Sequence, residues 1–195
     1  MLPEYFAYVG SGLFLFGTIF YIYKMLVGQA KPNKVTWGLW AFASGVGFAA
    51  AYSAGGGIQT LAPFASSFFP LLVFVLSFFV EQSYWKTKPL DYLVAVIVVL
   101  AILLWAIIDQ PIVTLVLAII ADALAYFPTF IKIKQEPSTE PAVTYLFAVA
   151  GPVIVLLTIN SWEVSRYLFP LYLTLINLLT VSFITVGNRQ QKATR

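Results

Sequence analysis

The chain contains neither cysteine nor histidine, and only 10% of its 195 residues are charged. Without cysteine it forms no disulfide and has no thiolate nucleophile, and without histidine it lacks the commonest general base. The usual ligands of zinc, haem and iron–sulfur clusters are missing too, so we expect no metal site and no cofactor. The chain therefore has few of the side chains that hydrolytic and redox reactions need, and we expect the protein not to be an enzyme.

Hydrophobic residues, by contrast, make up 61% of the chain and aromatic residues 17%. Soluble domains are only about half apolar, and a helix that crosses a bilayer needs roughly 20 apolar residues. Seven apolar segments of that kind are separated by short polar loops; they run over Tyr5–Val27, Val35–Ala54, Thr60–Val80, Leu90–Ile108, Ile112–Ile133, Ala142–Asn160 and Tyr167–Val186. This pattern predicts an all-α integral membrane protein with seven transmembrane helices, whose first partner is the lipid bilayer.

Basic residues are sorted between the loops. Ten of the eleven follow the first, third, fifth or seventh segment, namely Lys24, Lys31, Lys34, Lys86, Lys88, Lys132, Lys134, Arg189, Lys192 and Arg195. Only Arg166 follows an even-numbered segment. Because cytoplasmic loops carry the excess of Lys and Arg, we expect a multi-pass protein of the cell membrane with an external amino terminus and a cytoplasmic carboxyl terminus. The net charge of +3 is explained by this orientation signal, and we expect no nucleic-acid partner.

The sequence also matches itself weakly. At a shift of 105 residues the matched pairs include Tyr21 with Tyr126, Pro32 with Pro137 and Trp40 with Tyr145, and at a shift of 100 Ser77 falls opposite Asn177. We interpret this as two parallel three-helix repeats, at 1–83 and 111–188, joined by an inverting linker helix at 84–110 and followed by a cytoplasmic tail at 189–195. Chance matching of apolar sequences is the alternative. Parallel repeats place a ligand site centrally, at their interface.

One stretch of the second repeat resembles a known family. The sequence from Tyr126 to Lys134, followed by Ser138-Thr139-Glu140, is similar to the second-repeat signature of SWEET sugar transporters and the related PQ-loop proteins. That resemblance implies three helices, a linker and three more, with transport of a small polar solute, sugar-like or another metabolite, by alternating access. It also implies a hinge at Pro128 and Thr129, although Thr129 replaces the glutamine of the PQ-loop group. In the SWEET pocket two Asn side chains hold the sugar, and Asn177 and Ser77 fall at those positions.

Asp122 is the only carboxylate deep inside an apolar segment. It lies about 16 Å into the fifth helix, near the bilayer midplane. Acids at that depth face a cavity or a partner and are functional candidates, so protons are a further predicted partner. Tyr126 and Thr129 follow at i+4 and i+7 and share one polar stripe with it. The structural alternative is an acid that only hydrogen-bonds a neighbouring helix.

Further binding candidates are less specific. Tyr21, Trp40 and Tyr145 can stack on a solute, although aromatic side chains often fill membrane cores. Asn177 can grip a polar solute or hydrogen-bond a neighbouring helix, and Ser77 can bond its own backbone instead.

The leading hypothesis is therefore a transporter, with coupling to protons left open. The alternative is a SWEET-like receptor or scaffold that binds a peptide or protein partner. A retinal photoreceptor is disfavoured because the seventh segment contains no lysine. Assembly into a homo-oligomer is compatible with the sequence.

Overall fold

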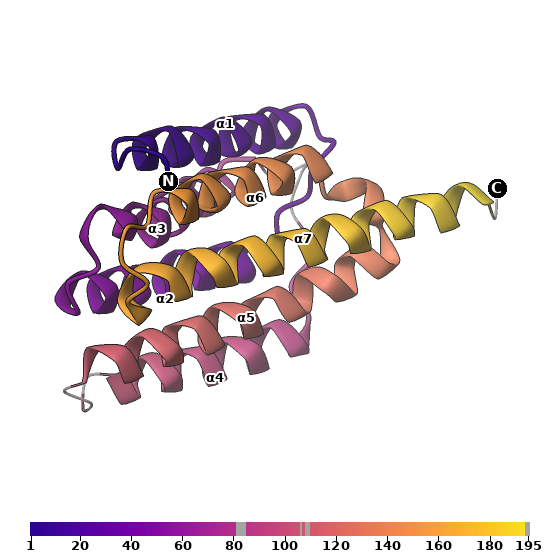
Figure 1. The fold of residues 1–195 in the computed structure, drawn as a ribbon. Coiled ribbons are helices and arrows are strands. Elements are labelled where there is room, and N and C mark those ends of the chain that lie inside the picture. The colour runs from indigo at the N-terminus through magenta and orange to yellow at the C-terminus, as the bar shows by residue number, and fades with distance from the viewer. Residues whose placement is uncertain (81–84, 106, 108–109, 194–195) are drawn as a thin grey trace.

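The computed structural model describes residues 1–80, 85–105, 107 and 110–193. Over these residues the regular structure is entirely helical. Its elements are α1 (Phe6–Leu26), α2 (Lys34–Ser53), the 3-10 turn η1 (Gly57–Thr60), α3 (Leu61–Leu76), α4 (Pro89–Trp105), α5 (Pro111–Gln135), the 3-10 turn η3 (Pro137–Thr139), α6 (Ala142–Leu157) and α7 (Val164–Ala193). The helices lie side by side along one common direction (Figure 1).

Four helices are long and apolar enough to cross a membrane by length and composition: α1, η1 together with α3, α5 and α7. The apolar part of α4 and the whole of α6 are shorter. The coarse prediction of an all-helical membrane protein is therefore confirmed. Although α2 has 20 residues, it is rich in small and polar side chains, and Trp37, Ser44 and Gly47 are among its many buried residues. It packs against α3, α4, α5 and α7, and a helix so covered by protein needs less lipid-compatible surface.

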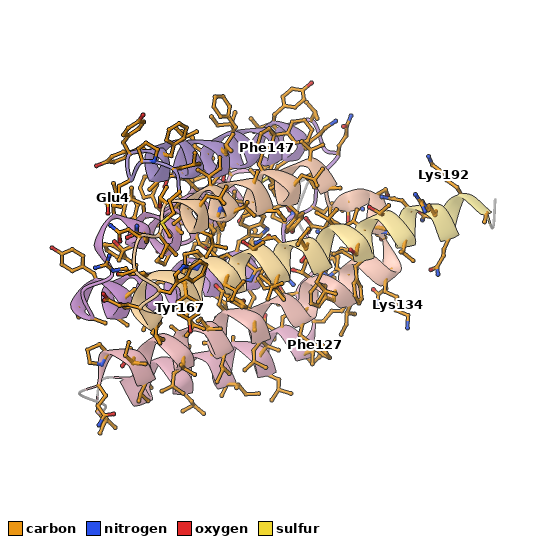
Figure 2. All side chains as sticks on the ribbon, in the orientation of Figure 1. Glu4, Phe127, Lys134, Phe147, Tyr167 and Lys192 are labelled. Atoms are coloured by element: carbon orange, nitrogen blue, oxygen red, sulfur yellow. The ribbon has the colours of Figure 1, made fainter. Side chains whose placement is uncertain are left out.

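The two ends of the bundle differ in charge, and the two chain termini lie at opposite ends (Figure 1). The end that holds the carboxyl terminus, here called the basic end, collects the loops after α1, α3 and α5. Backbone hydrogen bonds tie these loops together, from Lys31 N to the Thr139 oxygen at 3.3 Å and from Trp85 N to the Pro32 oxygen at 3.0 Å. Figure 2 shows Lys134 and Lys192 at this end and Glu4 and Tyr167 at the other.

Contacts among the first three helices are matched by contacts among the last three. Helix α3 packs on α1 and α2, and α7 packs on α5 and α6 in the same way. Across the middle of the bundle α1 packs on α6 and α2 packs on α5, while α4 lies against α5. Four helices, α1, α2, α5 and α6, therefore form two seams between the halves.

The α1–α6 seam is unusually close. A Cβ atom added to Gly10 would lie 2.6 Å from the carbonyl oxygen of Gly151, and one added to Gly151 would lie 2.5 Å from the oxygen of Gly10. Farther toward the basic end, the Thr144 hydroxyl donates a hydrogen bond of 3.1 Å to the Gly17 carbonyl oxygen. Glycine thus allows the two backbones to touch, as small residues do between membrane helices.

Among the described residues, helix boundaries differ from the prediction by four residues or more at two places. Helix α3 stops at Leu76 rather than Val80, and the hydroxyl of its C-cap residue Ser77 donates to the Phe74 carbonyl oxygen at 2.6 Å. Helix α7 continues to Ala193, so residues 189–193 of the expected tail are helical. The predicted repeat boundary at 83 and 84, the fourth segment's end at Ile108 and the basic Arg195 lie outside the described residues.

Candidate functional site

Asp122 points into the bundle and is 1% exposed. Its two carboxylate oxygens accept hydrogen bonds from different helices: the Ser44 hydroxyl of α2 donates at 2.8 Å, and the Tyr172 hydroxyl of α7 donates at 2.6 Å. Ser44 is in turn 3.0 Å from the hydroxyl of Ser66 on α3. Asp122 of α5 therefore forms the centre of a polar group that joins four helices.

A small cavity lies beside this group, at the centre of the bundle. It measures about 30 Å³. Six helices contribute its walls, through Phe14, Thr18, Trp37, Trp40, Ser66, Pro70, Tyr126, Thr144, Tyr145, Ala148 and Asn177. A polar cavity of that size holds a water molecule, whereas sites for small metabolites measure hundreds of cubic ångströms. The structure is therefore in a closed conformation, in which the central cavity is too small for a metabolite.

One polar part of the cavity wall is formed by a hydrogen-bonded pair of side chains from α5 and α7. The Tyr126 hydroxyl donates to the Asn177 side-chain oxygen at 3.3 Å, and the Asn177 amide nitrogen donates to the Leu173 carbonyl oxygen at 2.8 Å. Both side chains are buried. Each of these two groups can make a further hydrogen bond to a molecule in the cavity, because a phenol and an amide both donate and accept.

Aromatic rings form the remaining wall, toward the basic end. The Trp40 ring lies 4.4 Å from the Tyr126 ring and 5.2 Å from the Trp37 ring, measured between centroids. Tyr21 stacks behind them, 4.5 Å from Trp37. The Trp40 indole nitrogen and the Tyr21 hydroxyl are buried and have no hydrogen-bond partner among the described residues. Two donors are thus unsatisfied next to the cavity.

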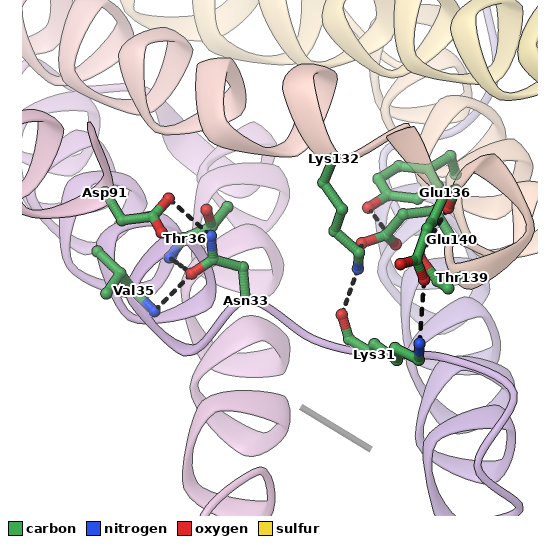
Figure 3. Close-up of polar contacts among 10 residues, drawn as sticks. Lys31, Asn33, Val35, Thr36, Asp91, Lys132, Glu136, Thr139 and Glu140 are labelled. Carbon is green, nitrogen blue, oxygen red and sulfur yellow. Dashed lines mark hydrogen bonds and ion pairs between the residues drawn. The ribbon is translucent and has the colours of Figure 1, made fainter. Parts of the chain in front are cut away.

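Beyond the aromatic wall lies a buried ion-pair cluster, formed by Lys132, Glu140, Tyr145 and the backbone carbonyl of Lys31. Figure 3 shows Lys132, Glu140 and Lys31 in it. The Lys132 ammonium lies 2.6 Å from one Glu140 carboxylate oxygen, with side-chain exposures of 0% and 2%. It also donates to the Lys31 carbonyl oxygen. The Tyr145 hydroxyl donates to the other Glu140 oxygen at 2.9 Å. Closer to the surface, Lys31 and Glu136 form a more exposed ion pair of 3.0 Å.

A second polar cluster lies at the start of α2 (Figure 3). The Asn33 side-chain oxygen caps α2 by accepting from Val35 N and Thr36 N, at 3.1 and 3.4 Å. The Asn33 amide donates to Asp91 at 2.9 Å, and Asp91 also accepts from Lys88 N at 2.6 Å. This cluster satisfies the first turns of α2 and α4 and is a structural feature of the basic end.

The structure brings most predicted site residues together. Tyr126, Tyr145, Trp40 and Asn177 line the cavity, and Asp122 and Tyr21 lie directly behind its wall.

Ser77 is not part of the cavity wall, because it lies past the end of α3 and bonds its own helix. The predicted hinge residues Pro128 and Thr129 are buried within α5, which continues through them without interruption.

Several residues of the site escaped sequence reasoning. Tyr172, Ser44 and Ser66 bond around Asp122, but hydroxyl residues are common in membrane helices and nothing in their spacing marks them. Lys132 and Glu140 both fall within the stretch that resembles SWEET proteins. In the sequence, Lys132 counts only toward the orientation signal. The one feature that could have indicated an ion pair is that Glu140 is an acidic residue among basic loops.

A larger groove of about 750 Å³ lies between the basic-end halves of α5 and α7. Its walls are mostly apolar, with Phe130, Leu179 and Phe183 among them, and Lys134 at its edge. None of the predicted binding residues lines it. Within the described part of the chain no three acidic, cysteine or histidine side chains are grouped to hold a metal ion.

Comparison with protein-family models, with curated proteins and with solved structures finds no match for this chain.

Proposed function

We propose that this protein is a membrane transporter of a small polar solute that works by alternating access around the central cavity. The observation that carries the proposal is that one cavity is walled by α1, α2 and α3 together with α5, α6 and α7, with a buried carboxyl group directly behind it. A site shared by two groups of helices opens and closes when the groups move relative to each other.

The proposal includes the 3+1+3 arrangement, with seven membrane-crossing helices and α4 as the linker. Matched packing of α3 on α1 and α2 and of α7 on α5 and α6 supports two equivalent units. The resemblance to SWEET and PQ-loop proteins supports the same arrangement. Collection of basic residues at the end that holds the carboxyl terminus supports a cytoplasmic location of that end.

Coupling to protons is part of the proposal, because the hydrogen bonds around Asp122 suit both of its protonation states. As a carboxylate it accepts from Ser44 and Tyr172. As a neutral acid it can donate to Ser44, because a hydroxyl both donates and accepts. The contact between Ser44 and Ser66 can run in either direction, so the chain of hydroxyls can reverse and reach the cavity wall at Ser66.

The test is uptake into liposomes with and without a pH gradient, screened over sugars, amino acids and vitamins. We expect a gradient to accelerate uptake of at least one solute. Asp122→Asn should abolish the acceleration while solute exchange without a gradient persists, because asparagine resembles the neutral acid: its oxygen accepts from one hydroxyl, its amide donates to the other, and it cannot be deprotonated. Ser44→Ala interrupts the hydroxyl chain and should weaken the pH response, whereas Thr185→Val, at an exposed hydroxyl that bonds the Val181 carbonyl oxygen of its own helix, is the control and should keep it. Absence of flux for every solute would refute transport, and an unchanged pH response in Asp122→Asn would refute coupling.

Binding of an acidic peptide, as a receptor would require, is less well supported. Such a ligand needs a basic side chain in the cavity, and no lysine or arginine is among the residues that line it. Lys132 is the nearest along α5, and its ammonium is engaged by Glu140 and the Lys31 carbonyl.

A further inference from the structure

We propose that the buried ion-pair cluster is the gate that closes the central cavity toward the basic end, and that separation of Lys132 from Glu140 opens the path on that side. The inference rests on the proposed transport function for its purpose, but the gate itself can be tested without a solute.

Position is the first argument. Tyr145 belongs to both structures: its side chain lines the cavity, and its hydroxyl donates to Glu140. Lys132 lies six residues beyond Tyr126 on α5, about 9 Å closer to the basic end. The Lys132 ammonium also lies 5.7 Å from the ring of Trp85, in the segment before α4. The cluster therefore occupies the route from the cavity to the loops of the basic end.

The cluster joins parts of both halves. Lys132 is on α5 and Glu140 immediately precedes α6, whereas the Lys31 carbonyl is in the loop between α1 and α2. Lys132 and Glu140 belong to the same half, so a relative movement of the halves at this end acts first on the hydrogen bond between Lys132 and the Lys31 carbonyl oxygen. Loss of that bond leaves the ammonium with one partner fewer and weakens its hold in the pair. The gate is thus connected to the movement that alternating access requires.

Burial gives the gate two distinct states. A buried ion pair stays favourable only while its partners remain in close contact, since an isolated charge in a dry interior is very costly. Once the partners separate, water must enter to solvate both charges. The pair therefore favours either a dry closed state or a wet open state over intermediate ones.

Comparison of the two halves shows that the pair is not needed to build a three-helix unit. The shift of 105 residues that matches Tyr21 with Tyr126 places Val27 and Val35 at the positions of Lys132 and Glu140. The first half folds with two apolar residues where the second has a buried ion pair. A role in opening explains why the charges are there despite the cost of burying them.

The absence of natural cysteine makes the gate measurable with one introduced thiol. Thr18→Cys places a reporter in the cavity wall of protein reconstituted in liposomes. A membrane-impermeant thiol reagent is then applied separately to each face. In this background we expect slow labelling from the basic-end face. Adding Lys132→Met should accelerate labelling from that face by about tenfold or more, because it leaves the Glu140 charge buried and unpaired in the closed state and so disfavours that state.

Two further variants keep the test decisive. Tyr145→Phe removes one hydrogen bond to Glu140 without leaving a buried charge unpaired, and should accelerate labelling severalfold even if Lys132→Met does not fold. Lys31→Met is the matched control: it removes the exposed pair with Glu136 but keeps the backbone carbonyl, and labelling should not change. If Lys132→Met folds and labelling is unchanged, the gate is overturned. If Lys132→Met does not fold, unchanged labelling in Tyr145→Phe overturns it. If labelling accelerates but the protein transports no solute, the gate is supported and only the proposed transport function is refuted.

Discussion

Two buried ionic side chains of this protein are satisfied in different ways. Lys132 has a counter-ion in Glu140, whereas Asp122 has only hydroxyl partners in Ser44 and Tyr172. An ion pair keeps its charges only while it is intact. A carboxyl group among hydroxyls can instead gain or lose a proton while its partners reorient. The first arrangement suits a structural change, and the second suits proton exchange.

At the polar wall of the cavity we predict that Tyr126→Phe weakens solute binding but changes thermal stability only slightly. Loss of the hydroxyl leaves the Asn177 oxygen without its donor, and hydrogen bonds between membrane helices contribute about 0.6 kcal/mol on average. The thermal midpoint should therefore fall only slightly. KM for a transported solute should rise severalfold, because the Asn177 amide loses one of the two hydrogen bonds that hold its orientation and keeps only the bond to the Leu173 carbonyl oxygen. Tyr23→Phe, at a side chain 57% exposed, should change neither.

Concentration-dependent uptake and thermal unfolding of the same preparations check this prediction. A large loss of stability with an unchanged KM would mean that the bond between Tyr126 and Asn177 serves only helix packing.

Sequence reasoning found the site residues whose chemistry is unusual in a membrane. Asp122 is conspicuous because acids are rare at that depth, and helical spacing places Tyr126 one turn beyond it. Ser77 follows from the repeat register and from the resemblance to SWEET proteins, and it lies past the end of α3, where its hydroxyl bonds its own helix. The Lys132–Glu140 pair depends on the path of the loop after α5, which no local pattern encodes.

At the scale of helices, the α1–α6 seam gives a sharp packing prediction. Gly10→Ala would place a Cβ 2.6 Å from the backbone oxygen of Gly151, which cannot move aside without moving α6. Overpacking of this kind costs about 1–3 kcal/mol. We therefore expect a lower thermal midpoint in detergent. Gly12→Ala is the matched control on the same helix, because its added Cβ meets nothing within 4 Å.

The control should be neutral or slightly stabilising, since alanine favours helix by about 1 kcal/mol over glycine. Equal effects of the two substitutions would show that the backbones are not in close contact at Gly10.

Helix boundaries were predictable where a breaker is present and less so elsewhere. Pro111 begins α5, and Asn33 caps α2 close to where the apolar segment begins. The length of α7 was underestimated because hydropathy falls after Val186, although nothing there stops a helix. Gly187 even aids its continuation, because its missing side chain lets α7 pass Pro137, 3.0 Å from where a Cβ would lie.

For the whole molecule we predict that the two chain termini lie on opposite faces of the membrane. Single cysteines at Glu4 and Gln191, in a chain without natural cysteine, should react with an impermeant maleimide from opposite sides. We expect Gln191 on the cytoplasmic side, because basic residues are in excess at its end of the bundle. Labelling of right-side-out and inverted vesicles measures this. Reaction of both sites from one face would contradict the seven-span arrangement.

The close contact of α1 with α6 has a consequence for how the halves can move. Backbones that touch at Gly10 and Gly151 leave no room for sliding or further approach there. The α2–α5 seam is joined through side chains, among them Ser44 and Asp122, which can separate and rejoin. If the halves move as we propose, we expect the α1–α6 contact to act as the pivot and the largest displacement to fall on α2 and α5, which carry Ser44 and Asp122.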